Sequence, residues 1–269
     1  MTLGASPSPA QVVAELGQTS PYTFPDARSR WLADVGSSDP ITFPTSFANK
    51  TALKIPATTG ASGVSTSHSF AGVNFGPVFT NRRLLCYVIA HGKSAGVETP
   101  ADVTVTNFTV GGVPPVGGVA PLFFWYYAGT TDSAVFSGVQ SDSFNPSGTS
   151  GTISFTTNIA LNCSVIVFSM IGSNDIESGS SNGNFSEFSP ISDTLNVQND
   201  ATLITVGVQN SSATLTVSGC TKRSQFSPVA GYQCVVGYDN HQAAQTGRAI
   251  SISGSSGAAT AMITDGWNW

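Results

Sequence analysis

Few residues of this chain have the type and spacing that enzyme chemistry requires. The segment 179–183 reads Gly-Ser-Ser-Asn-Gly and fits the Gly-x-Ser-x-Gly pattern of a serine nucleophile. That pattern works only on a sharp turn between a strand and a helix, because the turn exposes the hydroxyl. Here the surrounding residues are Ser, Gly and Asn, which favour a loop. We therefore expect no catalytic serine in this segment.

The histidines and carboxylates give no stronger signal. His68, His91 and His241 are far apart, and none has a second His four residues away, so no metal site is predicted. A glycosidase needs two carboxyl groups on either side of the sugar bond. No spacing singles out such a pair among the acidic residues Asp132, Asp142, Asp175, Glu177, Glu187 and Asp193. We expect no catalytic residue, no metal and no cofactor.

The composition excludes several classes of protein. Charged residues are only 9% of the 269 residues, and the formal net charge is −5. Phosphate-driven binding needs clustered Lys and Arg, so no nucleic-acid partner is expected. No segment approaches the roughly 18 consecutive apolar residues of a membrane span.

The N-terminus and the cysteines indicate a reducing compartment. The first residues lack the basic and apolar regions of a signal peptide, so we expect synthesis in a cytoplasm. Free thiols are then more probable than disulfides. Cys86, Cys163 and Cys234 lie in apolar runs and are expected to be buried.

The first 50 residues differ from the rest and form a leader. Apolar residues at helical spacing predict helices over 10–16 and 26–35, each followed by a glycine. Similar phrases follow them, Ser-Pro-Tyr-Thr-Phe-Pro over 20–25 and Asp-Pro-Ile-Thr-Phe-Pro over 39–44. Units this short are not expected to bury their own apolar faces. We therefore expect the leader to dock onto another protein through its large aromatic residues, which are Phe24, Trp31, Phe43 and Phe47.

From about residue 51 the apolar residues recur with a period of two. Segments rich in Val, Ile, Thr and Phe are separated by Gly, Pro, Asn and Ser, which predicts strands without intervening helices. We expect a mainly β protein, with an antiparallel, jelly-roll-like β-sandwich over 51–269 preceded by the leader over 1–50. The expected strands are 51–56, 65–76, 83–91, 102–111, 119–128, 133–140, 151–157, 163–171, 201–208, 212–219, 230–238, 247–253 and 258–265.

Two of these strands are hydrophobic on both faces, over 83–90 and 121–127. One face of each fills the core, and the other must pack under a loop or against a neighbouring subunit, because a large exposed aromatic face is costly. Trp125 is accordingly a candidate docking residue. Trp267 and Trp269 end the chain, and they either cap the core or dock onto another protein.

The longest expected loop covers 172–190. It exceeds the usual loop length, which indicates a functional or mobile segment. Asn and Asp side chains next to an aromatic residue suit sugar recognition. The candidate receptor-contact residues in this loop are Asn174, Asp175, Asn182, Asn184 and Phe185.

The leader resembles the N-terminal leader of many tail and fibre proteins of tailed bacteriophages. The matching segments are 13–17, 20–25 and 40–50, although such leaders usually close with Gly-Lys and this chain has Asn49-Lys50. The strand region is similar to jelly-roll-like virion proteins of phages and gene-transfer agents. The segments that carry this second resemblance are 69–76, 83–91, 103–115, 150–158, 163–172 and 259–269. The resemblance implies a structural virion component of the tail, fibre or baseplate.

Together these observations favour a non-enzymatic virion protein that is anchored by its leader to other virion proteins. We expect a homo-oligomer whose sandwich projects for assembly and for attachment to a host surface glycan. Two alternatives stay open: a capsid decoration or head-spike protein, and a glycan-binding adhesin. A polysaccharide depolymerase is less favoured, because the residues supply no organised acid–base pair.

Overall fold

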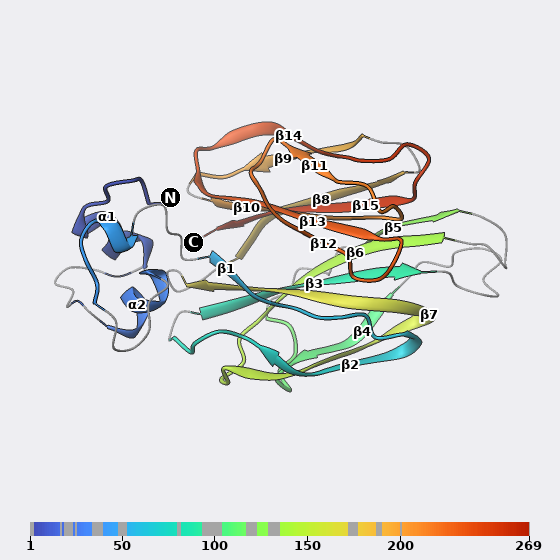
Figure 1. Cartoon of the computed structure of the whole chain (residues 1–269), viewed down its shortest axis with the longest axis horizontal. Helices are drawn as coiled ribbons and strands as arrows, with labels where there is room; N and C mark the ends of the chain where they lie inside the picture. Colours follow the sequence, from blue (N-terminus) through green and yellow to red (C-terminus); the bar gives the residue numbers. More distant parts are fainter. Residues whose placement is uncertain are drawn as a thin grey trace.

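The computed structural model describes residues 3–16, 18, 24, 26–33, 40–47, 53–79, 82–92, 104–116, 123–128, 135–171, 177–186, 190–199 and 201–268. As predicted, it is mainly antiparallel β-sheet with two short helices near the N-terminus (Figure 1). The helices are α1 (Pro9–Glu15) and α2 (Ala27–Ala33), followed by a 3-10 turn over Thr45–Phe47. No helix of this part of the chain is long and apolar enough to cross a membrane.

The strands fall into two groups that are consecutive in the sequence. The first group is β1 (Leu53–Thr58), β2 (Val64–Asn74), β3 (Arg82–Gly92), β4 (Val105–Val110), β5 (Phe123–Ala128), β6 (Val135–Phe144) and β7 (Ser150–Ile171). The second group is β8 (Glu177–Ser186), β9 (Ile191–Val197), β10 (Ala201–Gln209), β11 (Thr216–Ser218), β12 (Lys222–Phe226), β13 (Gln233–Gln242), β14 (Gln245–Ser253) and β15 (Thr260–Asn268).

The first half of the strand region is a sandwich that shares one long strand between its two layers. One layer has the order β1-β7-β3-β6-β5. The first part of β7 pairs with β2 and β4 to form the other layer, whereas its last part pairs with β1 and β3. β7 has 22 residues, which is long enough to serve both layers.

The second half repeats this arrangement strand by strand. Its five-stranded sheet has the order β12-β13-β10-β15-β8, and its three-stranded sheet has the order β11-β14-β9. β8 to β13 take the places of β1 to β6, while β14 and β15 take the two parts of β7. The expected single sandwich over 51–269 is therefore two jelly-roll-like sandwiches in tandem. The duplication is not evident in the sequence, because the two halves share the pattern of strands and not a visible run of identical residues.

The two five-stranded sheets pack face to face and form a central core (Figure 1). From the first half it takes Leu85, Tyr87 and Ile89 of β3, and from the second half Ile204, Val206 and Val208 of β10, all fully buried. The alternate β3 residues, among them Leu84, Cys86 and Val88, face the separate core of the first half. The second hydrophobic face of the strand 83–90 is therefore covered by the other half of the same chain, and not by a loop or a neighbouring subunit.

A buried polar triplet lies within the central core. The Tyr87 hydroxyl donates to Oδ2 of Asp265 at 2.7 Å, and Nε1 of Trp267 donates to the same hydroxyl oxygen at 3.3 Å. Burial and the nearby Asp265 carboxylate raise the pKa of Tyr87 well above its ordinary value, so the hydroxyl keeps its proton and can donate. Since Tyr87 lies on β3 while Asp265 and Trp267 lie on β15, the triplet joins the two halves.

The leader has a small core of its own, contrary to the expectation from its length. Leu3, Val12, Leu16 and Leu32 are at most 1% exposed and pack together with Ala33. A capping box starts α1, in which Ser8 and Gln11 satisfy each other's backbone N–H groups. The expectation failed because the two helices bury their apolar faces against each other, which neither unit could do alone.

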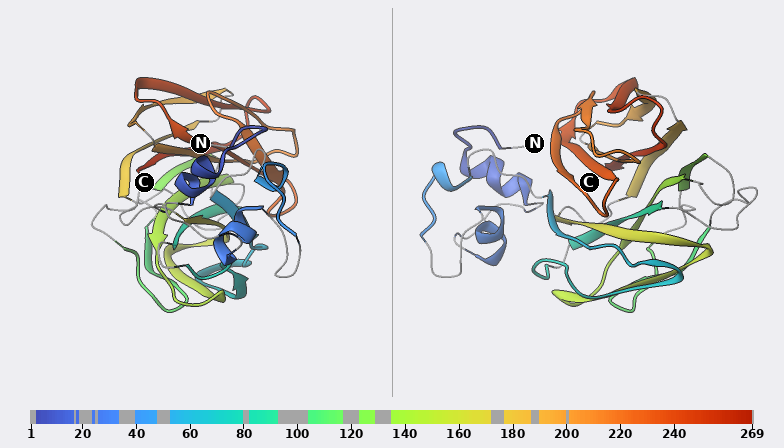
Figure 2. Two further views of the ribbon diagram at one scale, coloured as in Figure 1. Left: turned by 90° about the vertical axis from the view of Figure 1, so that its left-hand side faces the viewer. Right: turned by 45° about the vertical axis from the view of Figure 1, so that its right-hand side comes forward.

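The leader lies beside one end of the stacked sheets (Figure 2). The guanidinium carbon of Arg28, on α2, lies 5.8 Å from the centroid of the Phe79 ring, just before β3. This cation–π contact is a described link between the leader and the strand region. The C-terminal end of β15 is at the same end of the molecule (Figure 1).

The segment 172–190 differs most from its prediction. β8 occupies 177–186 of this expected loop and pairs along its length with β15. Ser, Gly and Asn have a low strand propensity, but the backbone of β15 offers a free row of hydrogen-bonding groups, and tertiary pairing overrides propensity. β9 and β12 were also not predicted, and the two expected strands 151–157 and 163–171 are the single strand β7.

We predict that Tyr87 and Asp265 contribute to the stability of the fold cooperatively, so that the effects of substituting them are not additive. Tyr87→Phe should lower the free energy of unfolding by about 2–3 kcal/mol, because it removes a buried donor to a carboxylate. Asp265→Asn should be destabilising as well, and the double variant should be less destabilised than the sum of the two, by about 1 kcal/mol or more. Urea unfolding of the four proteins measures this cycle, and strictly additive losses would contradict the coupling.

Candidate functional site

The leader residues predicted to dock are partly used inside the leader. Phe24 and Phe43 pack edge to face, with ring centroids 5.2 Å apart, and both lie half-buried against the leader core. Trp31 is on α2 and Phe47 is in the 3-10 turn, but their side chains lie outside the described residues, as does Trp269 altogether. The two halves of the repeated phrase thus meet through their phenylalanines.

Trp267 and Trp125 have different outcomes. Trp267 is 4% exposed and belongs to the central core, so of its two expected roles it has that of capping the core. Little of its surface is left for a partner protein. Trp125 lies on β5, at one edge of the first five-stranded sheet, and its side chain is outside the described residues.

The candidate receptor residues are on a strand and not on a loop. Asn182, Asn184 and Phe185 all belong to β8, whereas Asn174 and Asp175 lie outside the described residues. Asn184 is exposed, and its Nδ2 donates to the Ser192 backbone oxygen at 2.7 Å. The Gly-x-Ser-x-Gly segment 179–183 is also inside β8, so it forms no strand-to-helix turn.

Ser62 and His68 form a hydrogen-bonded pair that the sequence analysis did not connect. Ser62 Oγ is 2.8 Å from Nδ1 of His68, and Nε2 of His68 is 3.1 Å from Oγ1 of Thr157. Thr157 Oγ1 donates its own proton to the Ile159 backbone oxygen, and Ser62 Oγ donates to the Gly63 backbone oxygen at 2.9 Å, so the Ser62 proton is not dedicated to His68. The signal in the sequence would have been a Ser and a His on either side of Gly63, a residue type that favours a tight turn.

This pair has the residue types of a nucleophile and its base but lacks the support that catalysis requires. His68 is 1% exposed and stacks on Phe155, and burial lowers its pKa. The group behind it is the neutral Thr157 hydroxyl, which stabilises an imidazolium far less than a carboxylate does. The Cys163 N–H also donates to Ser62 Oγ. The geometry therefore supports a structural tie between the β1–β2 turn and β7.

His91 is a second buried imidazole, in a different environment. It is 0% exposed at the end of β3, and its ring centroid is 5.4 Å from that of Tyr232. Neither ring nitrogen has a hydrogen-bond partner among the described residues. Burial lowers its pKa to about 4, so the ring is neutral at neutral pH.

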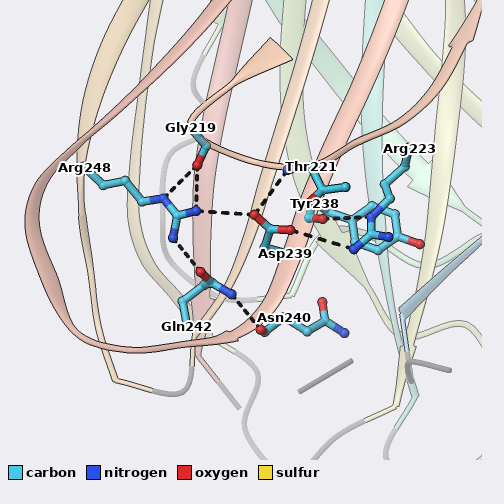
Figure 3. A network of polar contacts seen from close by, with 8 residues as sticks. All are labelled: Gly219, Thr221, Arg223, Tyr238, Asp239, Asn240, Gln242 and Arg248. Atoms are coloured by element: carbon cyan, nitrogen blue, oxygen red, sulfur yellow. Dashed lines mark hydrogen bonds and ion pairs between the residues drawn. The ribbon is translucent and has the colours of Figure 1, made fainter. Parts of the chain in front are cut away.

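A network of charges (Figure 3) lies at the end of the second half that is nearer the leader, because Leu203 of β10 pairs with both Asp239 and Gly266, close to the C-terminal end of β15. Arg248 donates to the Gly219 carbonyl from Nε at 2.8 Å and from Nη2 at 2.6 Å, and Nη2 also lies 3.3 Å from Oδ2 of Asp239. Arg223 lies over the Tyr238 ring at 4.7 Å and pairs with Asp239 at 3.8 Å. Since these residues come from β12, β13, β14 and the turn before β12, the network fastens these elements together.

Gly219 cannot be replaced without moving this network. Its φ is +85°, which side-chain-bearing residues rarely adopt, and a Cβ there would overlap the backbone oxygen of Ala249. The glycine therefore lets the chain pass close to β14 and present its carbonyl to Arg248.

Arg82 serves a similar purpose in the first half. It is 1% exposed, and its guanidinium donates to the backbone oxygens of Gly76, Pro77, Pro146 and Gly148. Four carbonyl partners replace the water that this cation loses on burial. Arg82 thus ties the β2–β3 connection to the β6–β7 turn.

The thiols confirm the expectation of free cysteines. Cys86, Cys163 and Cys234 are buried, and Cys220 is half-buried beside the charge network. Burial, assisted by the Asp239 carboxylate, raises the pKa of Cys220 to about 12. A thiol with so high a pKa is a poor nucleophile at neutral pH. The described residues also contain no group of three or more His, Cys, Asp or Glu that could hold a metal ion.

Comparison with protein-family models, curated proteins and solved structures finds no match to this chain.

We predict that His91 makes the fold sensitive to acid. Its pKa is about 4 when folded and 6.5 in the unfolded chain, so the unfolded state binds more protons as the pH falls from 6.5 towards 4. Stability should fall in that window, and His91 should account for about 2–3 kcal/mol of the loss between pH 7 and pH 4.5. His91→Leu should remove that share, measured by urea unfolding at both pH values, while the share of His68 remains. An unchanged pH dependence in His91→Leu would contradict the assignment.

We predict that Ser62 is structural. Ser62→Ala should cost about 1–2 kcal/mol of unfolding free energy, since it removes the hydroxyl that joins Cys163 N–H and His68. Ser65→Ala, whose hydroxyl accepts only a local bond from Ser67, should change stability by less than about 0.5 kcal/mol. A fluorophosphonate probe should not label Ser62 in the native protein. Rapid labelling that Ser62→Ala abolishes would reverse this interpretation.

Proposed function

We propose that the protein is a structural virion component of the phage tail, fibre or baseplate type, attached through its leader and projecting its two sandwiches. The resemblance of 13–17, 20–25 and 40–50 to phage leaders supports the attachment. The resemblance of the strand region to jelly-roll-like virion proteins supports the assembly role. The virion proteins that it contacts, and its location in the particle, belong to the same proposal.

The separate leader core is the observation that carries this proposal. The leader is folded around Leu3, Val12, Leu16 and Leu32, and it lies beside one end of the sheets (Figure 2). A small unit with its own core can keep its shape while its outer surface binds another protein. This arrangement modifies the expected mode of docking, because Phe24 and Phe43 stabilise the leader as well as border its surface.

The strand region suits a structural component that bears mechanical load and catalyses no reaction. Three apolar cores follow one another through the stacked layers, and the second sandwich repeats the first. The polar clusters at the leader end, around Arg82 and Asp239, fix turns next to the site of attachment. Rigid turns at that end would transmit force from the leader into both halves.

Host attachment is the second part of the proposal, and its described candidate residues lie on a strand instead of on the expected loop. The expected receptor loop is largely the strand β8, so Asn182 and Asn184 would present amides from a regular backbone. Exposed Asn184 is the described residue that best fits a glycan contact. A head-spike location is the alternative for the same molecule, because a leader can attach to either part of a particle.

We predict that removing residues 1–50 separates folding from incorporation. The truncated protein should keep the circular dichroism spectrum of the strand region and unfold within a few degrees of the full chain, because the central core does not include the leader. It should be absent from purified particles when it is the sole copy supplied to infected cells.

A substitution far from the leader provides the control. Val64 is 60% exposed at the start of β2, and Val64→Ser should leave both stability and incorporation unchanged. Normal incorporation of the truncated protein would refute attachment through the leader.

A further inference from the structure

The two five-stranded sheets have four edge strands, and these edges form two pairs. β1 and β5 end the first sheet, while β12 and β8 end the second. β1 and β12 form the opposite edges of the two sheets, where Ile55 of β1 and Phe226 of β12 both pack against the central core. On the other side β5 and β8 lie side by side (Figure 1).

The β1 and β12 edges carry the features that prevent strand pairing. β1 contains Lys54 and Pro56, and β12 begins with Lys222 and Arg223. Lysines and prolines on an edge strand block the addition of another strand, through charge and through the missing N–H. Lys222 Nζ also donates to the Leu215 oxygen at 2.6 Å, which holds the charge near that edge.

The β5 and β8 edges carry no such features. β5 reads Phe-Phe-Trp-Tyr-Tyr-Ala, and β8 has its one charged residue, Glu177, at its first position. Neither contains proline, and no described strand pairs with the outer side of either. A long, uncharged edge presents a row of backbone donors and acceptors to another strand. The two unprotected edges of the five-stranded sheets thus lie on the same side of the molecule.

We propose that a second copy of this chain pairs edge to edge on the β5/β8 side, with β8 antiparallel to β8 of the other copy. A two-fold axis perpendicular to the sheets would bring β5 against β5 at the same time, since the two edges are stacked. Both sheets would then continue across the dimer. Neither pairing involves the leader, so the inference stands apart from the proposed attachment to a virion.

A second copy fits these edges better than an unrelated peptide. An antiparallel strand pair is self-complementary, because each strand offers its partner the groups that it receives. Two neighbouring edges match another such double edge, whereas a single extended peptide could cover just one. The chain also packs its own two related halves face to face, so it is already a pair of equivalent units.

The experiment measures the association of the full chain and of Asn182→Lys by sedimentation velocity across a range of concentrations. Asn182 lies in the middle of β8, where a lysine would meet like charge across the two-fold axis. We expect a dimer for the unmodified chain and a dissociation constant raised at least about tenfold in the variant. Ser218→Lys adds the same charge on the edge strand β11 and should leave the dimer intact.

Cross-linking provides a readout that does not depend on weakening the dimer. In antiparallel pairing, facing residues are about 5 Å apart between Cα atoms, which suits a disulfide. We expect at least one of three single variants on β8 to form a disulfide-linked dimer on mild oxidation: Ser180→Cys, Asn182→Cys or Asn184→Cys. Ser218→Cys should form none. A monomeric full chain at high concentration, or a dimer that is unaffected by Asn182→Lys and captured by none of the β8 cysteines, would overturn the proposal.

Discussion

The packing of the two five-stranded sheets against each other is the constraint on which the rest of the molecule depends. It requires β3 and β10 to be buried on both faces, because each strand contributes to the core of its own sandwich and to the central core. A strand with no solvent-facing side has no place for charge. The low charge content of the chain follows in part from this arrangement, since charged residues are almost never buried without partners.

The polar groups that are buried in these layers are placed where each can be satisfied or kept neutral. The Tyr87 hydroxyl links the Asp265 carboxylate to the Trp267 indole at the contact between the halves, and His68 lies between the hydroxyls of Ser62 and Thr157. In a low-dielectric interior such bonds hold strands in one register, because any slip leaves a polar group unpaired. Ionic groups are gathered instead at the turns near the leader, where partial exposure lowers the cost of burial.

The proposed assembly role uses three different parts of this architecture. The leader supplies a compact unit at one end, the duplicated sandwiches supply a stiff body, and the edges β5 and β8 supply a surface for pairing with a second copy. The charged residues on β1 and β12 oppose such pairing at the opposite edges of the two five-stranded sheets. A molecule of this design would associate in a defined way with few charged residues, because backbone hydrogen bonds and buried apolar faces do not need them.

The sequence by itself determined the class of the fold, the two short helices, most strands and the free, buried thiols. These features depend on local periodicity and composition, which can be read directly from the sequence. The tertiary structure alone decided that β8 is a strand, since its Ser, Gly and Asn residues acquire that conformation by pairing with β15. It also decided that the strand region is duplicated, that the second face of β3 meets β10, that Phe24 and Phe43 meet each other, and that Ser62 reaches His68 and Thr157. Contacts between residues far apart in the chain depend on how whole layers stack, and no local pattern encodes that.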